Sequence, residues 1–269
     1  MVGELLYKNL TYAIRQCIFE VHNDIGVGYD EETYHQGLIR RFDLEGISFA
    51  SKERIKLKHR GILIREFALD FLIEEKIILS LKCLPCDFLQ INFIQLFTEL
   101  KLWQKHLGLM ANFGQPKVKI ERRIYHEKPL VIDENYDYVK DQMSQTERQI
   151  MERLRQSIVF IGKLHGLGFG KSIVQKIVET ELGYQRIRFE KGVPIPVSYL
   201  GETIRTFKMR HLLIEQKIIC GITALQDSIT HHDISQIKSY LRALKLKIGL
   251  VVNFGKSKLE IKGVRGDHS

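Results

Sequence analysis

The chain has 269 residues, which is enough for one large domain or for two domains of roughly 100–150 residues each. With 44% hydrophobic and 27% charged residues it has the composition of a soluble protein with a sizeable core, and no apolar run approaches the ~20 residues of a membrane-spanning helix. The formal net charge of +9 favours a polyanionic partner such as DNA or RNA, although a lysine-rich solvated surface would give the same charge. The N-terminal sequence has neither an apolar signal core nor an Arg- and Ser-rich transit pattern, so we expect a cytoplasmic protein.

The first predicted element is a helix, because apolar residues recur at three- and four-residue spacing: Leu10, Ile14, Cys17, Ile18 and Val21. A Gly-x-Gly turn follows. We interpret it as a turn with positive φ, because the third glycine and the preceding strand of a phosphate-binding fingerprint are missing. The pattern then predicts a helix at 31–44, strands at 53–59, 62–73 and 76–82, a helix at 91–106, and strands at 107–112 and 117–124. Helices flanking a short mixed sheet make an α/β domain.

The second half of the chain repeats the first. "LGLMANFG" at 107–114 returns as "IGLVVNFG" at 248–255, an offset of 141 residues that also relates "IEEKII" at 73–78 to "IEQKII" at 214–219. With one residue of slippage, "GVGY" near the start of the first copy matches "GLGF" in the second. Matches in the same order along both halves predict a tandem duplication. We therefore expect domains at 1–126 and 144–269, joined by a polar linker without periodicity at 127–143.

Two residues of the predicted strands carry side chains that could take part in catalysis. Lys82 ends the strand 76–82 and shares a strand face with Ser80, because the two residues are two apart. Asp70 lies in the apolar strand 62–73, where a carboxylate must be paired, metal-bound or exposed. At the ends of adjacent strands, Asp70 and Lys82 form either a simple salt bridge or part of a catalytic site.

The surroundings of this pair follow a known pattern. "GYDEETY" at 28–34 fits Gly-x-x-Glu-x-x-Tyr, and the two strands are followed by Gln95 on a predicted helix and then by "NFG". Over most of residues 10–124, and in degraded form over about 150–262, the sequence resembles the GxxExxY protein family, a branch of the PD-(D/E)XK nuclease superfamily. The expected fold is accordingly α/β, with two tandem PD-(D/E)XK-nuclease-like domains.

The resemblance also implies a site. It implies a nuclease-like αβββαβ core in which Glu31, Asp70 and Lys82 border a divalent-metal site and Gln95 points into it. Phosphodiester hydrolysis needs carboxylates to hold Mg²⁺, which prefers hard oxygen ligands. A lysine beside the metal orients the water or stabilises the developing negative charge.

Ser80 departs from the family pattern, which has Glu-x-Lys on this strand. One hypothesis is that the site is catalytically inactive and that the fold has been kept for binding. The other is that the acid has moved, since some restriction endonucleases that this core resembles carry Ser-x-Lys with a glutamate on the following helix. Glu99 is the candidate, because it lies four residues after Gln95 on the same helical face. By the resemblance, it also stands where the family usually has an aromatic residue, which the second copy keeps as Tyr240. The simpler alternative is a surface glutamate paired with Lys101 or Lys105.

The second copy has lost the pattern. At the positions of Glu31, Asp70, Ser80 and Lys82 it has no carboxylate and no second-strand lysine, but instead Lys171, His211, Gly221 and Thr223. We therefore expect a degenerate pseudo-domain that packs against the first copy or extends a basic surface.

Two short stretches offer cations for nucleic-acid backbones. In "ERIKLKHR" at 53–60 the alternation predicts a strand face of cations, Arg54, Lys56 and Lys58, and "YQRIRFEK" in the second copy predicts another with Arg186 and Arg188. A charged edge strand also protects against aggregation, so phosphate contact and edge protection are both open. Backbone contacts would give affinity without sequence preference.

The sequence thus predicts a nucleic-acid-acting protein. The leading hypothesis is a Mg²⁺-dependent phosphodiesterase with Asp70, Glu99 and Glu31 as metal-binding acids, Lys82 as charge stabiliser and Gln95 as orienting group. The alternative is a catalytically inactive, nuclease-derived subunit that binds nucleic acid or assembles within a larger protein complex. A purely structural homo-oligomer is a third hypothesis, only weakly supported by the internal duplication.

Overall fold

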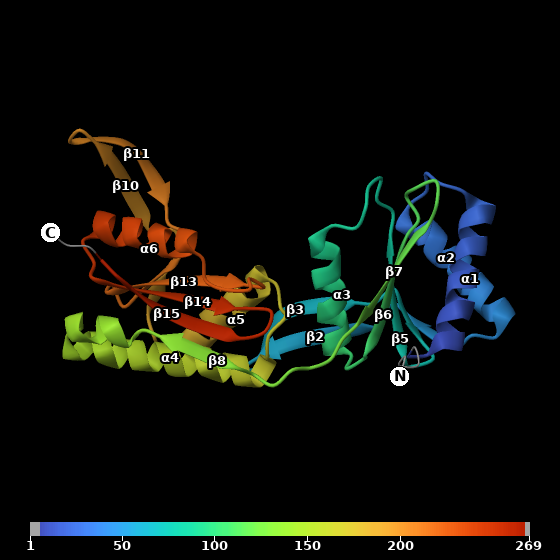
Figure 1. Ribbon diagram of the computed structural model, residues 1–269, viewed down its shortest axis with the longest axis horizontal. Helices are drawn as coiled ribbons and strands as arrows, with labels where there is room; N and C mark the ends of the chain where they lie inside the picture. The colour runs from blue at the N-terminus through green and yellow to red at the C-terminus, as the bar shows by residue number, and fades with distance from the viewer. Residues whose placement is uncertain (1–5, 267–269) are drawn as a thin grey trace, which may run out of the picture. The chain divides into compact units, whose positions relative to one another are not determined.

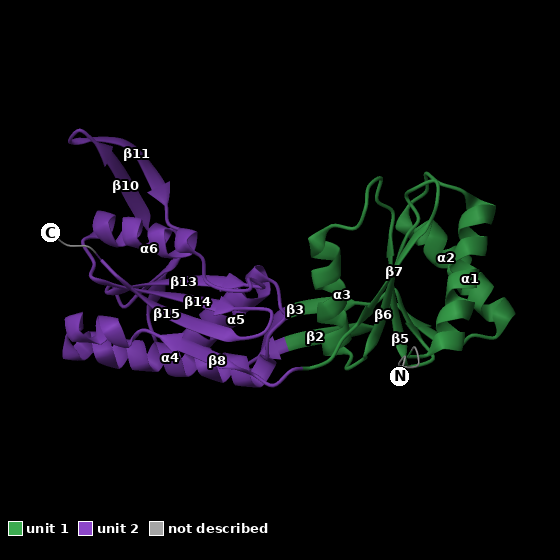
Figure 2. Cartoon of the chain, viewed as in Figure 1, with its two compact units in different colours: residues 1–57, 65–127 green, residues 58–64, 128–269 purple. Residues whose placement is uncertain are grey.

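The computed structural model describes residues 6–266. The chain divides into two compact units, the first made of residues 1–57 and 65–127 and the second of residues 58–64 and 128–269 (Figure 2). In the described part of the chain, no helix is both long and apolar enough to cross a membrane.

The first unit contains a mixed sheet with the order β1-β4-β5-β6-β7. Only β5 and β6 are parallel in it, and the helix α3 makes the crossover that a parallel pair requires. β2 and β3 pair with each other in a separate hairpin. The elements in chain order are α1 (Lys8–Ile25), α2 (Glu31–Glu45), β1 (Phe49–Ser51), β2 (Arg54–His59), β3 (Ile62–Ala68), β4 (Phe71–Ile73), β5 (Ile77–Lys82), α3 (Gln90–Leu102), β6 (Leu107–Asn112) and β7 (Lys119–Ile124).

Helices cover both faces of this sheet, α1 and α2 on one side and α3 on the other (Figure 1). Alternation along β5 separates the two cores. Ile77, Leu79 and Leu81 pack in a cluster with residues of α1 and α2, whereas Ile78 packs in a second cluster with residues of α3. Ser80 and Lys82 share the face of Ile78 and therefore lie on the α3 side of the sheet.

The second unit repeats this plan. Its sheet has the order β8-β15-β14-β13-β12-β9; β13 and β14 are parallel and connected by α6, and β8 adds a second parallel pairing, with β15. The elements are β8 (Ile132–Asn135), the 3-10 helix η1 (Asp137–Gln142), α4 (Gln145–His165), α5 (Lys171–Tyr184), β9 (Phe189–Glu190), β10 (Pro194–Tyr199), β11 (Glu202–Lys208), β12 (Leu212–Ile214), β13 (Ile218–Ala224), α6 (His231–Leu244), β14 (Ile248–Phe254) and β15 (Leu259–Arg265). The prediction of two tandem α/β domains, each a short mixed sheet with helices, is confirmed.

Three predicted elements differ from the structure. The strand expected at 62–73 is broken at Leu69 and Asp70, so that β3 belongs to the hairpin and β4 to the main sheet. The helix expected at 91–106 ends at Leu102, because the chain turns there and Gln104 adopts positive φ. Within the segment 127–143, expected to be a linker, β8 pairs with β15 and η1 follows it.

The tip of the β2–β3 hairpin, residues 58–64, belongs to the second unit and is anchored there by a buried carboxylate. Glu181 accepts hydrogen bonds from Arg60 through both oxygens, at 2.8 and 2.9 Å, and lies 2.7 Å from the Nε2 atom of His59. Burial alone would raise the pKa of Glu181, but hydrogen bonds from Arg60, Gln185 and His59 lower it to about 2. A buried carboxylate needs this full set of partners to stay ionised.

The repeated "NFG" sequence holds a loop in place. Asn112 is fully buried, and its Oδ1 atom accepts from the backbone N–H of Leu84 at 2.8 Å and of Gly114 at 3.1 Å. Its Nδ2 atom donates to the carbonyls of Leu84 and Cys86. Gly114 packs directly on this loop, because a Cβ atom added to it would lie 2.5 Å from the carbonyl oxygen of Leu84. The loop after β5 is thus tied to the end of β6.

The Gly-x-x-Glu-x-x-Tyr sequence is held by a similar contact. The buried hydroxyl of Tyr34 donates to the carbonyl of Gly26 at 2.8 Å, and its ring stacks on Phe113 with centroids 4.6 Å apart. Gly26 and Gly28 have φ of 79° and 101°, which confirms the predicted turn. Asp30 then caps α2 by accepting from the N–H of Thr33. Glu31 is consequently fixed at the first position of the helix.

We predict that Gly114→Ala lowers the free energy of unfolding by about 1–3 kcal/mol, because the new methyl group collides with rigid backbone. Urea-induced unfolding followed by circular dichroism measures this. Gly183→Ala in α5 is the control, since an added Cβ atom there meets no atom within 4 Å, and alanine in a helix raises stability by up to about 1 kcal/mol. Equal stability of the Gly114→Ala and wild-type proteins would contradict the packing role of this glycine.

Candidate functional site

Asp70 is fixed by the break in the strand. β4 begins at Phe71, which pairs with Leu79, so the strand ladder on this side ends before Leu81. The Oδ2 atom of Asp70 accepts from the N–H of Leu81 at 2.8 Å, in place of a backbone carbonyl. The other oxygen, Oδ1, lies 3.5 Å from the Nζ atom of Lys52. One oxygen of the carboxylate thus satisfies the backbone of β5, and the other lies near Lys52.

Lys82 is the last residue of β5, and its side chain reaches the start of α2. Its side chain is only 12% exposed, and Nζ donates to the Oγ atom of Ser80 at 3.3 Å and lies 4.0 Å from the Oε2 atom of Glu31. Burial raises the pKa of Glu31 above its usual range and outweighs the opposing effect of Lys82, while the negative charge of Asp70 raises it further. The predicted shared face of Ser80 and Lys82 is therefore borne out by direct contact.

Glu99 faces the same place from α3 and is 3% exposed. Gln95, one turn earlier, donates from Nε2 to its Oε1 atom at 2.8 Å. Burial raises the pKa of Glu99 to about 7; the charges of Asp70 and Glu31 act in the same direction, and Gln95 and Lys82 against it. The interpretation of Glu99 as a surface glutamate is wrong, because the carboxyl group is buried.

The structure thus brings the predicted acids, the lysine and the amide into one electrostatic cluster: Glu31, Asp70, Lys82, Gln95 and Glu99. We call these residues the acidic cluster. They come from the start of α2, the β3–β4 break, the end of β5 and the middle of α3. Residues far apart in the sequence meet because the parallel strand β5 ends at this edge of the sheet.

Sequence reasoning missed two neighbours of the acidic cluster. Lys52, in positive φ between β1 and β2, lies 3.5 Å from Asp70 and 3.6 Å from Glu32. His35 is buried, stacks on Phe71, and its Nε2 atom lies 3.2 Å from the carbonyl oxygen of Asp70. His35 directly follows Tyr34 of the Gly-x-x-Glu-x-x-Tyr pattern. This neighbouring position on the predicted helix is the one sequence feature that could have identified it. No sequence signal identifies Lys52.

The acidic cluster fits a divalent cation in the type of its atoms. Glu31, Asp70 and Glu99 supply hard oxygen donors, and Glu99 is a buried carboxyl group whose charged neighbours include two further carboxylates. A cation among them would relieve the repulsion that raises the pKa of Glu99. Within residues 6–266, however, no three His, Cys, Asp or Glu side chains already stand close enough to bind one metal ion.

The second unit keeps the positions but not the acids. His211 stands directly before β12, as Asp70 stands before β4, and lies 2.8 Å from the Oε1 atom of Gln236. Tyr240 takes the place of Glu99, with its ring centroid 5.5 Å from that of His211. Lys171 begins α5, where Glu31 begins α2.

The predicted cationic strand face is formed in β2 and absent in the second copy. Arg54, Lys56 and Lys58 are exposed at alternate positions of β2, and Arg54 also pairs with Glu66 at 3.1 Å. Arg186 and Arg188 are exposed but lie in the turn between α5 and β9, where Arg186 has positive φ, so they do not form a strand face. The sequence pattern misled here because alternation over four residues also occurs in a turn.

Comparison with known proteins shows the family of the chain. A sequence model of the PD-(D/E)XK nuclease superfamily matches residues 8–123 and again residues 148–264, and the chain therefore belongs to this superfamily, as a tandem duplication. Members of the superfamily generally use divalent metal ions such as Mg²⁺. The chain matches no curated protein and no solved structure.

We predict that the raised pKa of Glu99 makes stability fall as pH rises. The folded state holds this proton up to about pH 7, whereas the unfolded state loses it near the ordinary value of 4.5, so unfolding becomes progressively easier between these two values. The loss is on the order of 3 kcal/mol for the 4.5-to-7 shift, in the absence of divalent cations. Chemical unfolding measured at a series of pH values checks it.

Glu99→Gln is expected to remove this pH dependence, since glutamine keeps the shape and has no proton to lose. The control is Glu202→Gln at the exposed tip of the β10–β11 hairpin, which should leave the profile unchanged. A wild-type profile that stays flat between pH 4.5 and 7 would show that Glu99 is not held protonated.

Proposed function

We propose that the first unit is a Mg²⁺-dependent phosphodiesterase that cleaves nucleic acid, and that the second unit is catalytically empty. The observation that carries this proposal is the buried carboxyl group of Glu99, which interacts electrostatically with Asp70, Lys82 and Glu31. A buried carboxyl group among other acids is unfavourable for the fold and useful for binding a cation.

Each member of the acidic cluster has a distinct role in this proposal. Asp70, Glu99 and Glu31 would hold the cation, which supplies polarisation of the phosphate and activation of water when it is bound. Lys82, held by Ser80 and Glu31, would stabilise negative charge on the phosphate oxygens. Gln95 orients Glu99 through the 2.8 Å hydrogen bond and acts as a positioning residue.

The finer assignments are parts of the same proposal. The Gly-x-x-Glu-x-x-Tyr sequence, with its helix start at Glu31, supports placing the chain in the GxxExxY branch. We retain the two copies, 1–126 and 144–269, as the duplicated domains, with β8 and η1 of the segment 127–143 added to the second one, and we retain a cytoplasmic location. In the second domain Lys171, His211 and Tyr240 replace the three acids, which supports the absence of cation chemistry there.

A second candidate function is nucleic-acid binding without cleavage, as a subunit of a larger assembly. It is favoured by the absence of a preassembled three-ligand metal cluster among residues 6–266. It is also favoured by the net charge of +9, which suits a partner with a phosphate backbone.

We predict metal-dependent cleavage of labelled DNA or RNA. The assay compares Mg²⁺, Mn²⁺ and EDTA on single- and double-stranded substrates. Lys82→Ala and Glu99→Gln should each lower the rate at least ~100-fold, because each removes a group that acts on the metal or the phosphate. The double variant Ser80→Glu/Glu99→Gln moves the acid back to the strand beside Lys82 and should recover part of the activity lost in Glu99→Gln. Lys76→Ala, in the turn before β5, is the control and should cleave like the wild type.

Two results would count against the phosphodiesterase. Cleavage that survives both Lys82→Ala and Glu99→Gln would come from a contaminant. Saturable binding without cleavage in any metal would favour the second candidate function.

We predict that the cations of β2 contribute to binding without sequence preference. Lys56→Glu should weaken binding of different oligonucleotides to a similar extent, and it should reduce the slope of log K against log salt by about 1. Lys76→Glu, with the same change of charge away from β2, is the control. Equal effects of the two variants would show that only the net charge matters, and edge protection would then be the remaining role of the β2 cations.

A further inference from the structure

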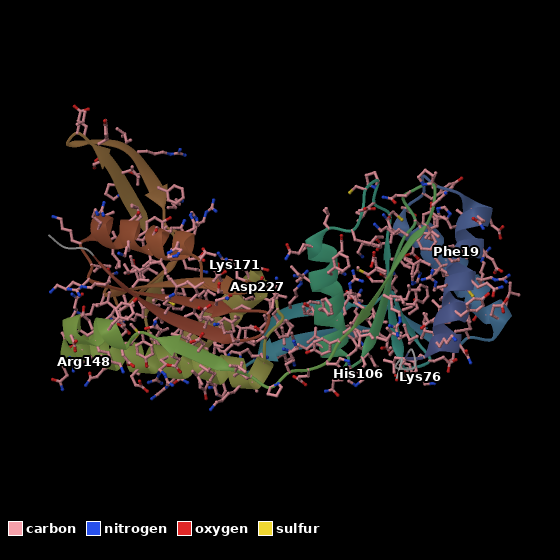
Figure 3. The ribbon with its side chains drawn as sticks, in the orientation of Figure 1. Phe19, Lys76, His106, Arg148, Lys171 and Asp227 are labelled. Carbon is pink, nitrogen blue, oxygen red and sulfur yellow. The ribbon has the colours of Figure 1, made fainter. Side chains whose placement is uncertain are left out.

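The second unit has a cavity where the first has the acidic cluster. Its volume is about 340 Å³. Its lining includes Lys171 at the start of α5, Lys191 and Gly192 before β10, and Arg210 and His211 in the break between β11 and β12. Figure 3 labels Lys171 at this end of α5.

The cavity lies at the break between β11 and β12, which corresponds to the break between β3 and β4 in the first unit. β3 and β4 are separated by Leu69 and Asp70, whereas β11 and β12 are separated by three residues, Met209, Arg210 and His211. The N–H of Met209 donates to the carbonyl of Val193 at 2.9 Å, as the N–H of Leu69 donates to Glu53, so the two breaks begin alike. The extra residue in the second copy is a cation beside the cavity.

The charge of the site is inverted relative to the first unit. Lys171 replaces Glu31 at the first position of the helix, His211 replaces Asp70, and Arg210 is added. The helix end differs as well: Asp30 caps α2 with its side chain, whereas α5 begins after Gly170 without a side-chain cap. The positive end of the α5 dipole is therefore not countered by a capping carboxylate.

The cations of the cavity differ in how they are paired. Lys191 forms an ion pair with Glu179 at 2.8 Å. Within residues 6–266, neither Lys171 nor Arg210 takes part in an ion pair, and both are exposed at the mouth of the cavity. Burial lowers the pKa of His211, against the hydrogen bond that its Nε2 atom donates to the Oε1 atom of Gln236.

We propose that this cavity binds a phosphate group, with Lys171 and Arg210 donating to the phosphate oxygens. Arginine and lysine together with an uncapped helix end are the groups that recognise phosphate in proteins. The phosphate belongs either to a nucleic-acid backbone or to a free phosphate compound. The proposal goes beyond the cleavage proposed for the first unit and stands whether or not that unit is active.

Isothermal titration of the full-length chain with inorganic phosphate, at constant ionic strength maintained with chloride, tests the cavity. We expect saturable binding in the wild type that weakens by about tenfold or more in Lys171→Glu and in Arg210→Glu. Lys217→Glu, which makes the same charge change in the turn before β13 and outside the cavity, should bind phosphate like the wild type. Circular dichroism of each variant verifies that the second unit is folded.

Two outcomes would overturn the proposal. One is the absence of saturable binding up to roughly 10 mM phosphate, which is weaker than a built site gives. The other is an equal loss of binding in Lys217→Glu and Lys171→Glu, which would reflect net charge alone. A folded Lys171→Gln variant with full phosphate affinity would exclude Lys171 as a ligand and overturn the assignment as well.

A second arm identifies the source of the phosphate. If the cavity takes a nucleic-acid backbone, a short oligonucleotide should compete with inorganic phosphate and bind more weakly to Lys171→Glu than to Lys217→Glu. If it takes a free phosphate compound, the oligonucleotide should bind both variants equally and leave phosphate binding unchanged. Both results support the phosphate site, and neither depends on cleavage by the acidic cluster.

Discussion

The break in the chain between β3 and β4 is the feature on which the rest of the site depends. Beyond Phe71, the first residue of β4, the N–H of Leu81 has no strand carbonyl to bind, and a buried N–H without an acceptor is costly. Asp70 supplies that acceptor at 2.8 Å, and this bond fixes the carboxylate at the end of β5. The same break releases β2 and β3 from the main sheet into a hairpin of their own. A single local constraint thus orients one acid and also sets the path of the neighbouring strands.

Burial of Glu99 is the main unfavourable term at this site. Its carboxyl group is inside the protein with Gln95 as its hydrogen-bond partner, and neighbouring acids raise its pKa further. The second unit avoids the free-energy cost of burying a carboxyl group, because Tyr240 takes the place of Glu99 and its ring lies near that of His211. A buried acid at a position that can hold an aromatic residue reduces stability unless a cation or a proton compensates for it. The position of Glu99 is therefore explained better by function than by folding.

Much of the architecture follows from the sequence, and the exceptions have physical causes. The strand at 107–112 and the duplication could be predicted because "NFG" and the apolar strands repeat, and the buried Asn112 and Asn253 explain why that sequence persists. The break at Asp70 could not be predicted, because the sequence of residues 62–73 is typical of one continuous strand. Lys52 reaches Asp70 through a positive-φ turn that no motif announces. Glu99 could be predicted only because the strand lacks an acid at Ser80, which leaves the next helix as its source.

The two copies show that the scaffold and the chemistry are separable. Asn253 and Gly255 repeat the loop contact of the first copy, since Asn253 donates to the carbonyl of Gln226 and a Cβ atom on Gly255 would lie 2.8 Å from the same oxygen. These residues serve the sheet, so they are retained where the acids are lost. The residues that border the site lie at strand and helix ends, where a change from Glu31 to Lys171 leaves the core untouched. Because such positions can reverse their charge without disturbing the fold, one duplicated scaffold offers an acidic site in the first unit and a cationic cavity in the second.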